Sequence, residues 1–163
     1  GVELTPFEER GIGSLYLDQG GARHMADSPK KEFDFEKAEI GEDLGSYDYV
    51  LSQRTVDSYR ASVEDPGAPF VTIGVKHDTT ALDMAYDDQV GGILARAEVE
   101  FYNAPIPGKK ILVTARIADK YWRRGKPYLV TEATAIDEDG RLLEIFRSYE
   151  VKKPDELGKK WQE

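Results

Sequence analysis

The chain has no cysteine among its 163 residues. Disulfide bonds and thiolate metal sites are therefore excluded, and the sequence lacks the paired cysteines that indicate an oxidising compartment. It also has no apolar run near the roughly 20 residues that a membrane helix needs. Its first residues, GVELTPFEERG, show neither the basic start nor the apolar core of a signal peptide. We therefore expect a cytoplasmic protein with no membrane segment.

Positive charge is also scarce. The net charge is −9, from 31 acidic and 22 basic residues. Nucleic-acid binding usually needs a clustered basic face, and the dense basic cluster here is limited to Arg123, Arg124 and Lys126. We therefore expect no nucleic-acid partner, although a small anionic ligand fits this cluster. The chain has no GxGxxG, P-loop, zinc-ligand spacing or GxSxG, so we expect no cofactor and no metal site.

The apolar content is sufficient for one domain. Hydrophobic residues make up 40% of the chain and charged residues 33%, which is typical of a packed core beneath a charged surface. Residues 1–35 contain several glycines and little periodicity, which predicts an extended N-terminal arm. Residues 36–153 predict a single domain, and residues 154–163 predict a charged C-terminal tail.

A strand and a short helix are predicted first in the domain. Residues 46–52 alternate aromatic or aliphatic side chains with polar ones, as in a half-buried strand. Thr55 then predicts a helix N-cap, and apolar residues follow at helical spacing as far as Val63. The segment EDPGAP, residues 64–69, ends this helix in a turn.

A second helix is predicted next. Residues 70–76 predict a short extended piece, after which Thr79 or Thr80 caps a helix over 79–89. Its apolar residues indicate a mostly buried helix, and a Gly-Gly pair ends it.

Four alternating strands form the clearest pattern in the chain. They cover residues 94–102, 111–122, 128–137 and 141–151. RRGK makes a tight connection between the second and third strands, and an Asp-Gly turn joins the third to the fourth. Such turn-linked strands predict an antiparallel sheet with one face on a core. The buried helix is the natural cover for that face, so the predicted fold class is α+β.

Two segments resemble a known family. DFEKAEIGEDLGSYDYVLSQRTVDSYRASVEDP runs through an Ile-Gly pair, a strand, a Thr-capped helix and an Asp-containing turn. AEVEFYNAPIPGKKILVTARIADKYWRRGKPYLVTEATAIDEDGRLL runs through an aromatic residue, Pro and Gly to a long strand ending in Arg-Gly and an Asp-Gly hairpin. Over roughly residues 33–152 the chain resembles MaoC-like acyl-CoA dehydratases and hydratases. The resemblance implies a hot-dog fold, in which an antiparallel sheet wraps around a central helix, and (R)-specific hydration of a 2-enoyl thioester or its reverse.

The resemblance also implies an Asp and a His, with four residues between them, at the turn after the small helix. Such a pair can activate water and protonate the α-carbon of the thioester. Asp65 stands where the Asp is expected, but the position five residues on is Phe70. The expected pair is therefore incomplete, and the alternative interpretation of Asp65 is a turn-forming residue before a proline.

His77 and Asp78 precede the predicted buried helix. An Asp at this place suits the positive end of a helix dipole, so the two residues can simply belong to a cap region. In the hot-dog dimers that the chain resembles, the active site lies near this helix start. His77 is therefore a candidate replacement for the missing His, and Asp65 and His77 are the candidate catalytic residues. The other histidine, His24, lies in the predicted arm.

Two further candidates carry alternatives of their own. Some hot-dog thioesterases use a carboxylate on the central helix, which makes Asp83 or Asp78 a candidate for thioester cleavage. Arg123, Arg124 and Lys126 are the candidate substrate-binding residues, since arginine forks match the phosphate oxygens of coenzyme A. The simpler interpretation of that cluster is a solvated hairpin loop.

Three functions stay open at this point. The chain is an enoyl-thioester hydratase or dehydratase acting on acyl-CoA, a non-catalytic hot-dog subunit or acyl-thioester binding module, or an acyl-CoA thioesterase. All three predict a homodimer or a heterodimer with another hot-dog subunit, because pairing removes the exposed edge strand of a single sheet.

Overall fold

A computed structural model of the chain describes residues 30–68, 77–87 and 92–152. Most of the predicted arm lies outside these residues, as do the extended piece at 70–76, the tail at 154–163, and His24 and Phe70. None of the described helices is long and apolar enough to cross a membrane.

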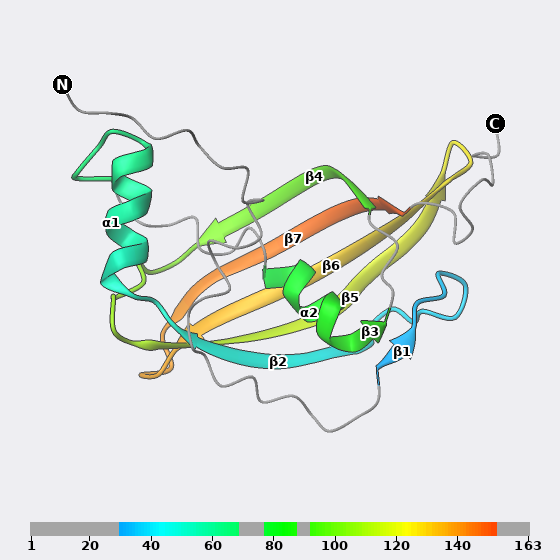
Figure 1. Ribbon diagram of the computed structural model, residues 1–163. Helices are drawn as coiled ribbons and strands as arrows, with labels where there is room; N and C mark the ends of the chain where they lie inside the picture. The colour runs from blue at the N-terminus through cyan, green and yellow to red at the C-terminus, as the bar shows by residue number, and fades with distance from the viewer. Residues whose placement is uncertain (1–29, 69–76, 88–91, 153–163) are drawn as a thin grey trace.

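The described chain is built on one five-stranded antiparallel sheet, which curves around helix α2, His77–Ala85 (Figure 1). The strand order is β2-β5-β6-β7-β4. The strands are β2 Asp43–Val50, β4 Gly92–Phe101, β5 Lys110–Arg123, β6 Lys126–Asp137 and β7 Leu142–Lys152. This confirms the predicted α+β hot-dog arrangement, with its helix wrapped by an antiparallel sheet.

The core lies between α2 and the concave face of the sheet. Alternate residues of β5 point into it, and Val113 and Ile117 are fully buried. From α2, Ala81 and Leu82 meet them, each 1% exposed. The two-residue period of β5 and β6 is the pattern that the sequence showed, since one face packs and the other meets solvent.

Helix α1, Gln53–Ser62, begins earlier than predicted. Its N-cap is Ser52, whose Oγ accepts the backbone N–H of Thr55 at 3.1 Å. The prediction of Thr55 as the N-cap was wrong, because the Ser52 hydroxyl already satisfies one of the free N–H groups of the first turn. Thr55 instead lies inside the helix, with its Oγ1 2.9 Å from Ser52 Oγ.

Both ends of helix α2 also differ from the predicted ones. It begins two residues before the predicted Thr79 cap, with His77 and Asp78 already in its first turn. It stops at Ala85, because the next two residues form the short strand β3, Tyr86–Asp87. β3 pairs in parallel with β1, Lys31–Glu32. The predicted extent of 79–89 was therefore wrong at both ends.

The segment before β2 packs onto the core. Phe33 and Phe35 are each 7% exposed, and Phe33 packs edge-on against Tyr86 at 5.2 Å between ring centroids. Lys120 Nζ donates to the backbone carbonyls of Phe35 and Glu36 at 3.0 and 2.9 Å. Among the residues that the structure describes, buried core contacts begin at Phe33, within the stretch predicted as an arm, whose boundary at residue 35 stays a prediction.

Both predicted hairpin turns are present. Between β5 and β6, Arg124 and Gly125 have φ of 52° and 68°, the left-handed conformation that a tight two-residue hairpin requires. Between β6 and β7, Gly140 has φ of 78° and donates its N–H to the carbonyl of Asp137 at 2.9 Å.

Candidate active site at the start of the central helix

The first residue of α2 places a histidine inside the protein. His77 is 3% exposed, and its Nε2 lies 2.9 Å from the hydroxyl of Tyr49. Tyr49 stands near the end of β2 and is only partly buried. The strand alternation that predicted residues 46–52 also points Tyr47 and Tyr49 to the same concave face.

The second ring nitrogen of His77 faces a carboxylate. Glu144 Oε1 lies 3.0 Å from His77 Nδ1, and the two side chains are 2% and 4% exposed. The atoms are at ion-pair distance, but they are not aligned as a hydrogen bond. Glu144 belongs to β7 and pairs with Ala135 of β6. Because paired residues point to the same side of a sheet and Ala135 lies in the core, Glu144 also faces inward. A charged side chain this deeply buried is costly unless it is paired.

The tyrosines around His77 are packed as a layer. Tyr47 and Tyr49 stack with their centroids 6.3 Å apart, and the Tyr47 hydroxyl donates to the backbone carbonyl of His77 at 3.4 Å. Burial raises the pKa of Tyr49 well above its ordinary value, and the charge of Glu144 adds to the effect. Both phenols are therefore neutral hydroxyls at neutral pH, since burial raises the pKa of Tyr47 as well.

Asp78 lies under the helix instead of facing solvent. Its Oδ2 accepts hydrogen bonds from the hydroxyls of Ser148 and of Thr131, the latter at 3.3 Å. Those two hydroxyls are 2.8 Å from each other. Burial raises the pKa of Asp78, although the hydrogen bond from Ser148 opposes the rise. Asp78 is 2% exposed, so it ties α2 to β6 and β7.

Asp65 is in a different setting from His77. It is exposed in the turn after α1, and its Oδ1 accepts the backbone N–H of Gly67 at 2.8 Å. Its carbonyl accepts from Ala68 at 3.2 Å. This is an Asx-type turn, the simpler of the two interpretations made from the sequence. Among the described residues, no hydrogen bond or ion pair joins Asp65 to His77, and Phe70 lies outside them.

The thioesterase candidate on α2 is Asp83, which occupies an exposed position of the helix. Partial desolvation raises the pKa of its carboxyl, and the charges of Lys30 and Lys152 oppose the rise. Asp83 and Asp78 thus lie on different sides of α2, and a role for either in thioester cleavage stays a prediction.

The basic cluster lies at the opposite end of the sheet from His77. Tyr49 pairs with Ile111 at the start of β5, whereas Arg123 pairs with Lys126 at its end. In Figure 1 the β5–β6 hairpin and α1 accordingly mark opposite ends of the sheet. The three basic residues are exposed, and among the described residues neither Arg123 nor Arg124 takes part in an ion pair.

Aromatic packing stiffens this hairpin. Tyr121 and Tyr128 stack across the two strands, 5.1 Å apart and within 7° of parallel. Trp122 packs edge-on against Phe35 at 5.6 Å and is still 55% exposed. The basic side chains of the hairpin therefore stand above packed aromatic rings.

The sequence interpretation missed Glu144 and gave Tyr49 no role beyond the strand. The sequence did indicate where Glu144 points, because it lies two and four residues before Phe146 and Ser148, which line the inner face of β7. A carboxylate at an inward position is a candidate functional group. Within residues 30–68, 77–87 and 92–152, no group of three or more His, Asp or Glu side chains is placed to hold a metal ion.

The order of the elements and of the strands defines the hot-dog class. No protein-family model matches the sequence, and no curated protein is significantly similar to it. Solved structures do match the fold.

The MaoC-like dehydratase from Rhodospirillum rubrum superposes with a TM-score of 0.55 at 12% identity, over 75% of this chain and 99% of that chain. The R-hydratase PhaJ1 from Pseudomonas aeruginosa gives 0.56 at 12%, over 81% and 96%. The HadBC (3R-hydroxyacyl-ACP dehydratase) complex from Mycobacterium tuberculosis gives 0.55 at 17%, over 70% and 98%. At these identities the likeness establishes the fold.

Proposed function

We propose that the chain binds acyl thioesters such as acyl-CoA and catalyses the reversible, (R)-specific hydration of a 2-enoyl thioester. The observation that carries the proposal is the buried pair of His77 and Glu144 at the start of the central helix. A carboxylate orients an imidazole and stabilises the imidazolium that forms when the ring takes up a proton. The first turn of α2 also has backbone N–H groups that suit a polarised thioester carbonyl.

The role of Asp65 in this reaction is part of the proposal. Its place after α1 matches the Asp of the family that the sequence resembles, and its exposure leaves Oδ2 accessible to a bound thioester. Asp65 therefore stays a candidate acid/base residue beside His77, and Asp65→Ala separates this role from the turn-forming one.

Turnover of a panel of crotonyl-CoA and longer 2-enoyl-CoAs tests the function. We expect loss of the enoyl absorbance with the wild type and a rate lowered at least tenfold in Asp65→Ala. Free thiol release in the same assay would indicate thioester cleavage instead. Absence of turnover with every chain length contradicts the enzymatic proposal.

A second candidate is a non-catalytic subunit or acyl-thioester binding module. It is favoured by two observations: Asp65 is engaged in its own turn, and His77 is almost fully buried. Calorimetric binding of acyl-CoA without turnover, together with a second hot-dog subunit in the complex purified from the native cell, supports it. Recovery of the self-associated chain alone contradicts the heteromeric form.

The proposed assembly is a dimer paired through β4. This edge strand is exposed on both faces, and Ile93, Leu94 and Phe101 are 58%, 53% and 51% exposed. Unpaired backbone groups and apolar side chains on one edge favour addition of a further strand. Light scattering should give twice the 18.3 kDa of one chain, and a monomer at micromolar concentration contradicts the dimer.

A further inference from the structure

The geometry points to Tyr49 as the catalytic residue that meets the substrate, with His77 and Glu144 as positioning residues behind it. This inference rests on the proposed hydration and deepens it. The three side chains form one chain of contacts, from Tyr49 Oη to His77 Nε2 at 2.9 Å and from His77 Nδ1 to Glu144 Oε1 at 3.0 Å. They come from β2, α2 and β7, so the fold assembles them from distant parts of the sequence.

Exposure decides which member reaches the substrate. His77 is 3% exposed and Glu144 1% exposed, so neither can contact a bound thioester directly. Tyr49 is partly exposed, and it is the outer end of the chain of contacts. The imidazole therefore has to act through the phenol, as a base acts through a nucleophile's hydroxyl in a catalytic triad.

The direction of the hydrogen bonds that link Tyr49, His77 and Glu144 follows from the groups that each ring nitrogen faces. When Nδ1 carries its proton toward Glu144, Nε2 is left as an acceptor for the Tyr49 hydroxyl. The Tyr49 oxygen then keeps its free lone pairs for a water molecule on its outer side. The contact between Nδ1 and Oε1 is not aligned as a hydrogen bond, and catalytic hydrogen bonds often reach good alignment only in the complex with substrate.

This arrangement gives a balanced reaction. Water gives a proton to Tyr49 Oη while the Oη proton passes to His77 Nε2, and Glu144 stabilises the imidazolium. The hydroxide bonds to C3 of the enoyl thioester, and the π electrons of the C2–C3 double bond move to C2. The proton then returns through Tyr49 to C2. One O–H bond of water and the C2–C3 π bond break, and one C–O and one C–H bond form, so no oxidant, reductant or cofactor is consumed.

The environment of Tyr49 fits a relay rather than a free tyrosinate. Burial, followed by the electrostatic effects of Tyr47 and Glu144, raises the pKa of its phenol well above the ordinary value. A neutral phenol is a weak base by itself. It needs the neighbouring imidazole to accept its proton as the water is activated.

The decisive variant is Tyr49→Phe, which keeps the aromatic ring and removes the hydroxyl. Tyr47→Phe is the matched control, because Tyr47 lies on the same face of β2 but its hydroxyl bonds to the backbone carbonyl of His77, at 3.4 Å, and to the side chain of Thr80. With crotonyl-CoA as substrate, we expect kcat to fall about 100-fold in Tyr49→Phe, the usual contribution of one acid/base group. Tyr47→Phe should stay within about twofold of wild type.

Two readouts separate this role from simple packing. Glu144→Gln should lower kcat and move the acid limb of the pH–rate profile to lower pH, which a packing role would not do. Nitrogen-15 NMR of the imidazole should show Nδ1 protonated in the resting protein. The chain has only two histidines, so His24→Gln assigns the signal of His77.

The outcomes are distinguishable. No turnover by wild type overturns the proposed function, and the Tyr49 role with it. An active wild type with an unchanged Tyr49→Phe overturns the Tyr49 role alone. An imidazole protonated on Nε2 also overturns the relay, whether or not any substrate is turned over.

Discussion

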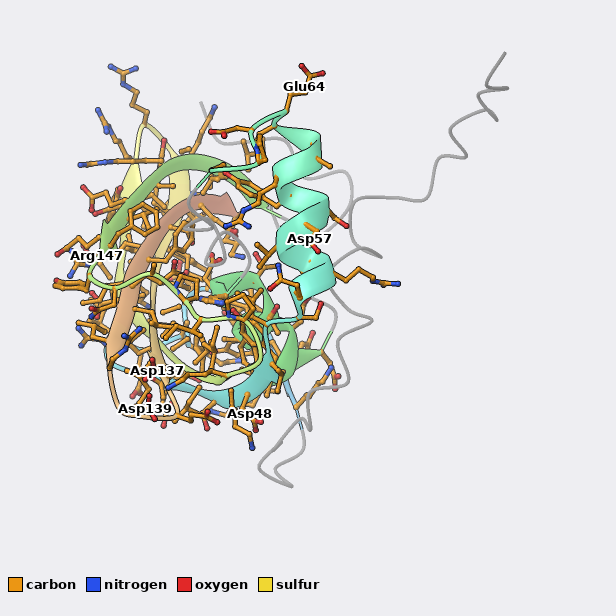
Figure 2. All side chains as sticks on the ribbon, turned by 90° about the vertical axis from the view of Figure 1, so that its left-hand side faces the viewer. Asp48, Asp57, Glu64, Asp137, Asp139 and Arg147 are labelled. Carbon is orange, nitrogen blue, oxygen red and sulfur yellow. The ribbon has the colours of Figure 1, made fainter. Side chains whose placement is uncertain are left out.

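The Nε of Arg147 on β7 donates a hydrogen bond to Oε2 of Glu132, its pairing partner on β6, at a distance of 2.5 Å. From the other side, Arg116 of β5 donates to Glu132 Oε1 at 2.8 Å through its Nη2. Figure 2 shows Arg147 on the face of the sheet that is turned away from α1. The convex face is thus cross-linked by charge over three adjacent strands.

This network predicts an acid-sensitive contribution to stability. Partial burial acts to raise the pKa of Glu132, but the hydrogen bonds from Arg116 and Arg147 outweigh it and hold the pKa below its usual range. The contribution is therefore present above the unfolded-state pKa, about 4.3, and is lost as the pH falls through the lower folded-state pKa.

We expect Glu132→Gln to lower the free energy of unfolding by about 1 to 2 kcal/mol at pH 7, in line with charge-assisted hydrogen bonds. Urea titrations at pH 7 and at pH 3 measure the free energy of unfolding, and the difference in this free energy between the variant and the wild type should shrink at pH 3. Glu36→Gln removes an exposed carboxylate and serves as the charge control. An equal effect of Glu36→Gln, or a pH-independent one, contradicts the network.

Asp78 predicts the opposite pH dependence. Burial raises the pKa of this carboxyl in the folded state, so the unfolded chain releases the proton first as the pH rises. Wild type therefore loses stability between the unfolded-state pKa, about 3.9, and the raised folded-state pKa. Asp78→Asn, whose side-chain oxygen can still accept from Ser148, should not show this loss. Thermal unfolding of both proteins from pH 4 upward checks it; parallel curves would rule out the effect.

The buried pair of His77 and Glu144 predicts strong non-additivity. Glu144→Leu leaves the buried imidazole without its carboxylate partner and should cost about 2 to 3 kcal/mol, the usual penalty for leaving a buried polar group unpaired. Adding His77→Phe removes the polar partner as well, so the double variant should be more stable than Glu144→Leu alone. A double-mutant cycle from denaturant unfolding measures the coupling, and purely additive effects would show that the two groups do not interact.

The basic hairpin predicts a charge-dependent affinity. If Arg123 and Arg124 bind coenzyme A phosphates, Arg123→Glu with Arg124→Glu should raise the KM for an enoyl-CoA at least tenfold. The KM for the same enoyl group on pantetheine, which lacks the nucleotide, should not change. Added salt should weaken the wild type but not the variant, because salt screens exposed charges. Equal effects on both substrates would place the phosphates elsewhere.

The strands, and the pairing of β5, β6 and β7 with their sequence neighbours, were predictable from local patterns. Over most of their length, β5 and β6 alternate buried residues with exposed or half-buried ones. The Asp-Gly and RRGK turns have a conformational requirement that only a few sequences meet. The helix ends were harder to predict. Ser52 rather than Thr55 is the N-cap of α1, because its hydroxyl lies where it can accept a backbone N–H of the first turn. Helix α2 stops at Ala85 because β3 pairs with a strand more than 50 residues earlier.

The candidate site was predictable only in part. His77 was identified from its predicted place just before the central helix, and in the structure it is the first residue of that helix. Its partners could not be read from the sequence, because Tyr49 and Glu144 are 28 and 67 positions away from it and meet it only through the sheet. Asp65 looked catalytic from its place in a family pattern, whereas its described contacts are those of a turn.

The strand order also sets how the chain reaches this structure. β5, β6 and β7 pair with their neighbours in sequence, so each pairing closes a short loop. β2 and β4 instead join the two edges after long intervals of chain. Loop-closure entropy penalises those late pairings. The central meander is therefore the expected folding nucleus, and the two edges, one of which carries Tyr49, are the last parts of the sheet to form and the first to open.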